Sequence, residues 1–427
     1  MNIVRKADKR PAVRERVPGL DLLRIVCMMM IVCSHFLIHG KVLKSLGPAD
    51  VNYYVGWMVE ACCFVMVDCF VLVTGYFQST SSFKLKKLLL LWGQIDFTSA
   101  VVYLVLCAAD RIVFSWDGFF SAAAAVTGRR YWFATAYLIL YAVSPLLNRA
   151  MENLTQREHF TACAILLGVF VLGRNVVWWK DFAALRGGYG YVSFVVLYVT
   201  AAYLRKYPPK PRKWLLPSFL LSALTGLSYV ILDTLSRRFG FPHQYVYVFL
   251  QYNSATVVAA SVCFFLFFLN LEIDGRFSRG LIGFFAPLAF GVYLVHDQPD
   301  ARALLWPWLN PSASARSPFL FLLLPATVLS VFLACSLADF ARRKLSGLCR
   351  IPAFAGKAAD AMERTARFVL NRFLPPERPS ELEERRTDRR SRSPDSSPPA
   401  DGSESARDPS LFPVVVVECR STSVQNR

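Results

Sequence analysis

Three ionisable side chains lie inside the first strongly apolar stretch of the chain. Residues 19–36 read GLDLLRIVCMMMIVCSHF, the composition of a membrane helix, yet they include Asp21, Arg24 and His35. An imidazole can act as a general base or carry a group covalently, and a guanidinium binds anions. A charge at the bilayer centre costs about 2.5–3.5 kcal/mol on insertion scales, so such groups usually face a cavity or a partner. These residues are therefore the first candidates for chemistry.

The spacing of these residues places them on one side of a helix. Arg24 and His35 are eleven positions apart, which is about 20° around a helix axis and about 16 Å along it. Asp21 lies one turn before Arg24, and His39 lies one turn after His35. We expect this polar stripe to face a single solvated cavity that enters the membrane from its inner surface. Two alternatives are that Arg24 extends to that surface and that His35 is only a packed histidine.

A second apolar stretch also carries acidic groups. VGWMVEACCFVMVDCFVLVTGYF contains Glu60 and Asp68. If the first two helices pack together, either carboxylate could hold the ring of His35 and fix its tautomer. The alternative is a structural ion pair with a neighbouring Arg or Lys.

Three lysines open the next apolar stretch, SFKLKKLLLLW. Lys84, Lys86 and Lys87 would lie at the inner membrane surface. They could bind the phosphates of a cytosolic donor, or they could serve only as the positive charges that orient a membrane helix.

Late in the chain, AFGVYLVHDQP places His296 and Asp297 at the outer end of a ninth apolar stretch. They could bind an acceptor molecule at the outer mouth of the cavity. The alternative is an interfacial histidine with no chemical role.

The elements that must position these side chains are membrane helices. The 427 residues are 55% hydrophobic, and apolar windows of about 20 residues recur along the chain. Because no alternating barrel pattern is visible, these windows should be helices, so the fold class is an all-α integral membrane protein. We predict about ten transmembrane helices, at 20–39, 54–77, 86–108, 131–149, 160–178, 187–205, 214–233, 245–270, 280–298 and 319–340.

Charge and cysteine content complete the domain picture. Lys and Arg favour the even-numbered connections and the ends, which predicts that both termini are cytoplasmic in a multi-pass protein of the cell membrane. We divide the chain into a basic N-terminus at 1–17, a membrane domain at 18–344 and a polar, disordered tail at 345–427. The charge of +18 therefore does not indicate a nucleic-acid partner. The eleven cysteines contain no CxxC pair, so no zinc site or other metal site is expected.

The quoted segments resemble one family. LDLLRIVCMMMIVCSHF resembles the first helix of the family 3 membrane acyltransferases, in which an arginine is followed after ten residues by a histidine. The resemblance continues in DCFVLVTGYF, SFKLKKLLLLW, YWFATAYLILYAVSPLLN and FGVYLVHD, and it covers roughly residues 18–342. It implies that His35 is catalytic, that Arg24 is required, and that Lys84, Lys86 and Lys87 stand where the family has a basic, acyl-CoA-binding motif with arginines.

The resemblance also implies a reaction. An acyl group, typically acetyl, would pass from cytosolic acetyl-CoA or another acyl-CoA to a hydroxyl of an envelope polysaccharide or other carbohydrate. The partners would then be the lipid bilayer, the acyl-CoA and the carbohydrate, with the oligomeric state left open. Two rival classes are a transporter or flippase, which predicts inverted repeats, and a sensor or scaffold with an incomplete site.

Overall fold

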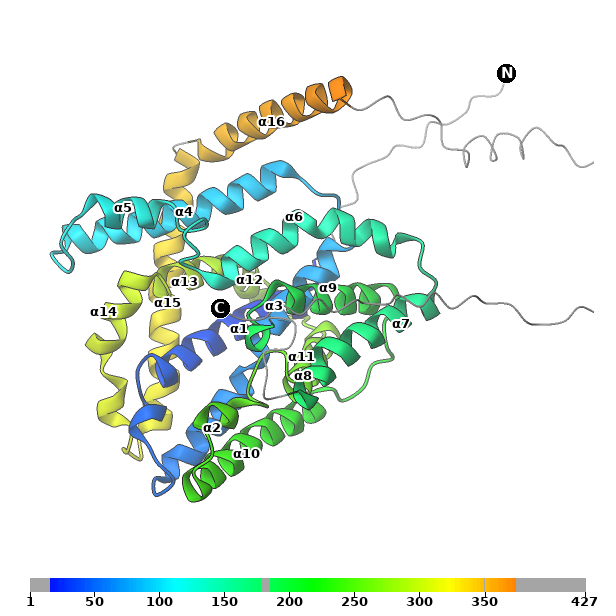
Figure 1. The fold of residues 1–427 in the computed structure, drawn as a ribbon. Coiled ribbons are helices and arrows are strands. Elements are labelled where there is room, and N and C mark those ends of the chain that lie inside the picture. The colour runs from blue at the N-terminus through cyan, green and yellow to red at the C-terminus, as the bar shows by residue number, and fades with distance from the viewer. Residues whose placement is uncertain (1–15, 178–184, 349, 374–427) are drawn as a thin grey trace, which may run out of the picture. The chain divides into compact units, whose positions relative to one another are not determined.

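The fold was analysed in a computed structural model of the chain, which describes residues 16–177, 185–348 and 350–373 (Figure 1). These residues form helices and connecting segments and contain no strand. The chain divides into two compact units, residues 1–365 and 366–427. Both cavities and the residues of the site belong to the first unit, and of the second the structure describes only the end of the last helix.

The helices follow one another along the chain with short connections. Those of the first half are α1 (Pro18–Ile38), α2 (Val51–Cys63), α3 (Val65–Gln78), α4 (Leu85–Ala108), α5 (Trp116–Ala123), α6 (Trp132–Glu152), α7 (Gln156–Leu167), α8 (Gly173–Val176) and α9 (Tyr191–Lys206). Those of the second half are α10 (Leu215–Phe239), α11 (Ala255–Leu269), α12 (Arg276–Phe285), α13 (Ala289–His296), α14 (Pro299–Leu309), α15 (Leu320–Leu348) and α16 (Ile351–Phe373).

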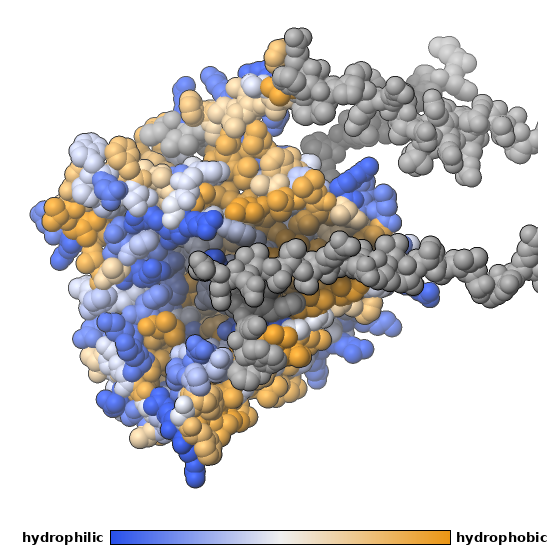
Figure 2. All heavy atoms as spheres, in the orientation of Figure 1, coloured by the Kyte–Doolittle hydropathy of each residue, from blue (hydrophilic) through white to orange (hydrophobic). Residues whose placement is uncertain are grey.

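Within the described residues, seven helical stretches are long and apolar enough to cross a membrane. They are Pro18–Ser45, Val51–Gln78, Leu85–Ala108, Gln156–Val176, Leu215–Phe239, Arg276–His296 and Leu320–Leu348. The chain is therefore a multi-pass integral membrane protein. Hydrophobic side chains are exposed over broad areas of its surface (Figure 2), as a surface in contact with lipid requires.

The other three predicted spans are helical but do not meet the same criterion. They correspond to α6, α9 and α11. The α6 helix has 21 residues but includes polar side chains such as Asn148 and Arg149, whereas α9 and α11 have only 16 and 15 residues. The structure thus supports seven of the ten predicted spans, and the sidedness of the termini stays a prediction.

The predicted start of the tail also differs from the structure. Residues 345–348 complete α15, and α16 covers the first part of the segment that we expected to be disordered. Apolar residues such as Phe354, Met362 and Phe368 recur there among charged ones. A compositional argument overlooks such a pattern, although it is typical of an amphipathic helix. Residues 374–427 and 1–15 lie outside the described residues.

The α1 helix is packed against much of the membrane domain, with contacts to α2, α3, α11, α13 and α15. Close approach is possible because small residues lie at the crossings. A Cβ atom added at Gly19 would clash with the carbonyl oxygen of Phe268 in α11. The stripe of α1 is therefore held against several helices rather than exposed to lipid.

The predicted ninth span is interrupted in its middle. A short 3₁₀ turn at Ala286–Leu288 separates α12 from α13, and it contains Pro287, which has no N–H to continue the helical ladder. The carbonyl of Pro287 instead accepts a hydrogen bond from the guanidinium of Arg343 on α15. The break makes α13 an independent short helix, and α13 carries the late histidine of the site.

Candidate active site

The structure brings the two membrane histidines into contact. His35, near the end of α1, and His296, at the end of α13, have Nδ1 and Nε2 3.1 Å apart. Nδ1 of His296 lies 2.6 Å from the carbonyl oxygen of Val292. A carbonyl oxygen only accepts, so Nδ1 of His296 carries a proton. When both rings are neutral, Nε2 of His296 accepts a hydrogen bond from Nδ1 of His35, which leaves the lone pair of His35 on Nε2.

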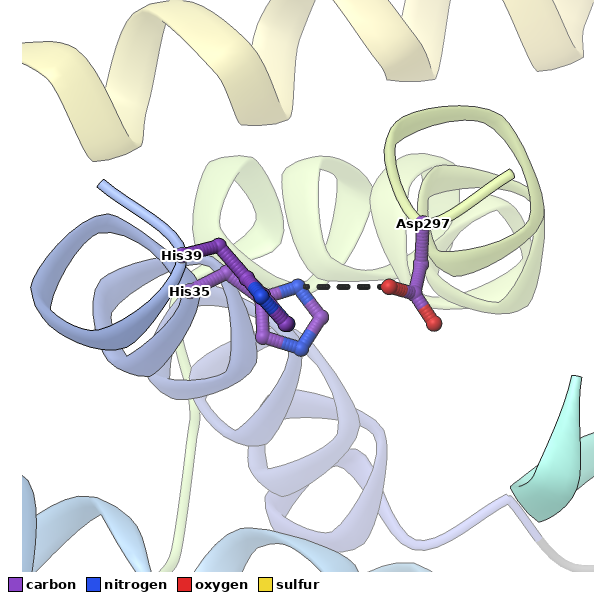
Figure 3. A group of neighbouring side chains, drawn as sticks. All are labelled: His35, His39 and Asp297. Atoms are coloured by element: carbon purple, nitrogen blue, oxygen red, sulfur yellow. Dashed lines mark ion pairs between the residues drawn. The ribbon is translucent and has the colours of Figure 1, made fainter. Parts of the chain in front are cut away.

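A carboxylate lies beside this pair. Oδ1 of Asp297 is 3.7 Å from Nδ1 of His35 (Figure 3). The same oxygen accepts a hydrogen bond of 2.9 Å from the guanidinium of Arg302 on α14. Asp297 is buried, and a buried charge needs a nearby partner of opposite charge, which Arg302 provides. Asp297 is also placed to stabilise a protonated imidazole at His35.

His39 extends the group by one helical turn. Its ring centroid is 4.7 Å from that of His35, and the two rings meet edge to face, overlapping in the view of Figure 3. The ligand atoms of His35, His39 and Asp297 all lie within 4.8 Å of one another, a set that a divalent cation could accept. A cation there would compete with His296 for Nδ1 of His35 and would lie near the guanidinium of Arg302. The same geometry also suits proton transfer, and the prediction of a metal-free site stays a prediction.

His35 opens onto a cavity of about 570 Å³, here called the His35 cavity. Its wall is rich in aromatic rings, with polar groups between them. The lining includes Ser34, His39, Trp57, Glu60, Trp132, Phe133, Arg186, Tyr189, Tyr247, Gln251, Tyr252, Tyr293, Asp297 and Arg302. Aromatic faces combined with carboxylate, amide and guanidinium groups suit a polyhydroxylated ligand, because its apolar ring faces can stack while its hydroxyls form hydrogen bonds.

The two carboxylates of the second span do not hold His35. Glu60 is buried and accepts a hydrogen bond of 2.7 Å from the hydroxyl of Ser34, while lining the His35 cavity. Asp68 is buried farther along α3 and accepts a hydrogen bond of 3.2 Å from Ser261 on α11. The neighbouring carboxylate of His35 is Asp297. Neither Glu60 nor Asp68 is therefore placed as predicted, because the hydrogen bond to Nδ1 of His35 is made by His296, and Asp297 only lies beside the ring.

Arg24 lies in a different cavity. This second cavity has a volume of about 580 Å³ and is here called the Arg24 cavity. Arg24 forms an ion pair with Asp21, and its guanidinium carbon lies 5.3 Å from the ring centroid of Phe77. Four cationic side chains line this cavity, namely Arg16, Arg24, Lys87 and Arg343. The cavity is therefore suited to a polyanionic ligand.

Arg343 is held in place by a buried carboxylate. Asp339 on α15 is fully buried and accepts hydrogen bonds of 2.7 Å from Nε of both Arg342 and Arg343. This carboxylate packs against α13 at Gly291, where an added Cβ atom would clash with the carboxylate carbon of Asp339. Close packing at Gly291 thus holds the carboxylate of Asp339, which in turn positions the guanidinium of Arg343 in the Arg24 cavity.

The three predicted donor-binding lysines have different surroundings. Lys87 lines the Arg24 cavity, with its ammonium 4.7 Å from the ring centroid of Tyr141. Lys84 precedes α4, and its backbone exchanges hydrogen bonds with the hydroxyl of Tyr141. Neither Lys84 nor Lys86 lines either cavity. Only one of the three is therefore placed with Arg24.

The expected single crevice is divided in two. Arg24 and His35 do lie on one helix, but their cavities have a single lining residue in common, which is Phe133 on α6. The helical spacing of the first stretch could not show this, because the dividing side chains come from other helices.

Sequence reasoning missed three residues of the site. Arg302 and Arg343 were treated only as basic residues outside the predicted spans, whereas in the structure Arg302 forms an ion pair with Asp297. Phe133 lies in the predicted span 131–149 and was given no role there. For Phe133 no local signal was available, since a phenylalanine in a membrane helix is unremarkable without its neighbours.

The fold and the site together define a multi-pass membrane protein with a buried imidazole pair at one cavity and a cationic second cavity. The chain matches the family model described as an acyltransferase domain over residues 17–339, and it belongs to acyltransferase family 3. No curated protein and no solved structure matches the chain. Membership confirms the resemblance inferred from the sequence and establishes the class of reaction as acyl transfer.

Proposed function

We propose that this protein moves a short acyl group, in the first instance acetyl, from acyl-CoA to a hydroxyl of a carbohydrate of the cell envelope. The observation that carries the proposal is the His35–His296–Asp297 group at the wall of an aromatic cavity, in a chain of an acyltransferase family. A transferase needs a base at its acceptor and an anion site for its donor, and the two cavities provide one each.

The donor is assigned to the Arg24 cavity. Coenzyme A carries several phosphate oxygens, and guanidinium groups bind these in bidentate fashion. Arg16, Arg24, Lys87 and Arg343 supply the positive charge. Since Lys and Arg favour the cytoplasmic side of membrane proteins, we assign this cavity to the cytosolic face, together with both termini.

The acceptor is assigned to the His35 cavity. In the proposed step, Nε2 of His35 takes the proton from the acceptor hydroxyl as its oxygen attacks the thioester carbonyl. The attack forms a carbon–oxygen bond and a tetrahedral intermediate. The carbon–sulfur bond of this intermediate then breaks, the carbon–oxygen bond becomes the ester bond, and the imidazolium of His35 gives its proton to the departing thiolate. His296 keeps Nδ1 of His35 protonated throughout, and Asp297 stabilises the positive ring. Arg302 or a backbone N–H would stabilise the tetrahedral oxyanion.

The test uses membranes from cells that produce the full chain. They are incubated with [1-¹⁴C]acetyl-CoA, and the label is measured in the carbohydrate fraction before and after mild alkali, which cleaves esters. We expect alkali-labile label with the wild-type protein and none above background with His35→Ala at equal abundance in the membrane. Label that is absent from the wild-type sample, or equal in both, would contradict the proposal.

A transporter remains the second candidate because two cavities of similar volume adjoin each other at one shared lining residue, Phe133. Such an arrangement would also suit alternating access. The two functions differ in product. A transporter moves its substrate unchanged, so it would give no alkali-labile label, whereas the transferase forms a new ester.

A further inference from the structure

Four aromatic side chains, here together called the aromatic ring, form a circuit of contacts at the boundary between the two cavities. It is formed by Phe133 and Tyr137 of α6 and by Phe290 and Tyr293 of α13. Successive ring centroids are 6.2, 6.4, 6.2 and 5.9 Å apart around the circuit. These separations are those of aromatic side chains in direct contact.

The position of the aromatic ring follows from the cavity walls. Phe133, Tyr137 and Phe290 line the Arg24 cavity, and Phe133 and Tyr293 line the His35 cavity. Phe133 is thus the one residue found in both linings. It is buried, and its ring is also packed against Phe70 on α3, with centroids 6.0 Å apart.

The two helices that form the aromatic ring are tied together. The hydroxyl of Tyr131, at the start of α6, donates a hydrogen bond of 2.8 Å to the carbonyl of Leu294 in α13. The α13 helix ends two residues later at His296, the partner of His35. Two of the four rings and one histidine of the pair therefore lie on the same short helix, so the path for the donor and the position of the base are set together.

This arrangement matters because the reaction needs both cavities at once. The phosphates of the donor have their cationic partners in the Arg24 cavity, whereas the base lies in the His35 cavity. The thioester end of the donor must therefore cross the aromatic ring, and a side chain in it must turn aside. A two-carbon acyl group needs little displacement, while each further methylene must be fitted between packed rings.

We propose that the aromatic ring is a gate for the acyl end of the donor and that Phe133 limits transfer to short acyl groups. This inference rests on the proposed function. It assigns a specificity-determining role to a side chain that takes no part in proton transfer.

The test measures transfer from acetyl-, butyryl- and hexanoyl-CoA by the full chain in native membranes. For Phe133→Ala we expect the ratio of hexanoyl to acetyl transfer to rise roughly tenfold or more, because one methylene of misfit is worth about 10–200-fold in rate. Phe133→Leu should give an intermediate ratio. Phe133→Trp should lower transfer even of acetyl, since it fills the passage further.

A matched control is Phe265→Ala. Phe265 on α11 is a buried phenylalanine whose ring centroid lies 5.7 Å from that of Tyr76, and it lines neither cavity. This substitution should leave the ratio of hexanoyl to acetyl transfer within about twofold of the wild-type ratio, because substitutions at independent sites affect each other by no more than about that factor. Because a ratio is measured, differences in protein abundance cancel.

A second readout does not depend on the reaction. Binding of desulfo-CoA, which lacks an acyl group, should be unchanged in Phe133→Ala and Phe133→Leu, since its phosphates need not cross the aromatic ring. If the wild-type protein transfers acetyl and the ratio of hexanoyl to acetyl transfer is unchanged in both variants, the gate is wrong and the proposed function is unaffected. A wild-type protein that transfers no acyl group at all would instead overturn the proposed function.

Discussion

The two cavities of this protein have nearly equal volumes but different chemical character. The Arg24 cavity, of about 580 Å³, contains four cationic side chains and one carboxylate, whereas the His35 cavity, of about 570 Å³, is lined by indole and phenol rings together with imidazoles, two carboxylates and two guanidinium groups. The α1 helix supplies the key residue of each, from positions about three turns apart. A single helix thus links an anion site to a base, and the difference indicates that binding of the donor and activation of the acceptor are separate tasks.

The largest expected effect is on the base. His35→Ala should lower acyl transfer by about 10²–10⁴-fold, because a positioned general base contributes that much to a rate. The rate is measured as alkali-labile label at equal protein abundance. His159 on α7 offers a control, since it is a buried histidine that lines neither cavity. If His159→Ala lowered transfer as much as His35→Ala, the loss would reflect stability rather than chemistry.

The next effect is on the donor site. Arg24→Lys keeps the charge but loses the planar fork, and we expect the KM for acetyl-CoA to rise by about 10-fold or more with little change in kcat. Arg205→Lys is a matched control. Arg205 also lies over an aromatic ring, that of Tyr76, but lines neither cavity. A loss of kcat with unchanged KM in Arg24→Lys would place Arg24 with the chemistry and erase the distinction between the cavities.

The third effect concerns the tautomer of His35. His296→Leu removes the acceptor for Nδ1 of His35, and we expect kcat to fall by about 10–100-fold with the KM for acetyl-CoA unchanged, as for other groups that orient a functional imidazole. His296→Gln should recover part of the loss, because an amide oxygen can accept the same hydrogen bond. Equal kcat values for the two variants would show that His296 serves only in packing.

The smallest effect separates two neighbouring lysines. Lys87→Ala should raise the KM for acetyl-CoA by about 2–5-fold, the range of a single partly exposed ion pair, and the effect should shrink in high salt. Lys86→Ala should have no such effect, since Lys86 lines neither cavity. Equal effects of the two substitutions would indicate a diffuse basic surface in place of a defined site.

The sequence predicted what depends on local geometry. The helix that carries Arg24 and His35 follows from apolar length and from the 3.6-residue period. The polar residues at the end of the predicted ninth span also named His296 and Asp297, although as acceptor-binding groups at an outer mouth. The contact between His35 and His296 could not be predicted, because it depends on how α13 is packed against α1, 261 positions away.

The errors have the same cause. Glu60 and Asp68 were reasonable partners for His35 by sequence distance, but each is bonded to a serine instead. The polar stripe of α1 was expected to face one cavity, because the sequence of a helix does not show which side chains of other helices lie across it. Phe133 of α6 lies between the two cavities, and no pattern in its own segment predicts that position.

Binding of labelled acetyl-CoA to the purified full chain in lipid nanodiscs most directly tests whether donor binding and base chemistry are separate. We predict that His35→Ala binds acetyl-CoA with a Kd within about twofold of the wild-type value, while Arg24→Ala binds at least about tenfold more weakly, since a charged hydrogen bond is worth about 1.5–3 kcal/mol. If His35→Ala lost binding as severely as Arg24→Ala, the two cavities would not have separate roles, and the assignment of donor binding to one cavity and base chemistry to the other would be wrong.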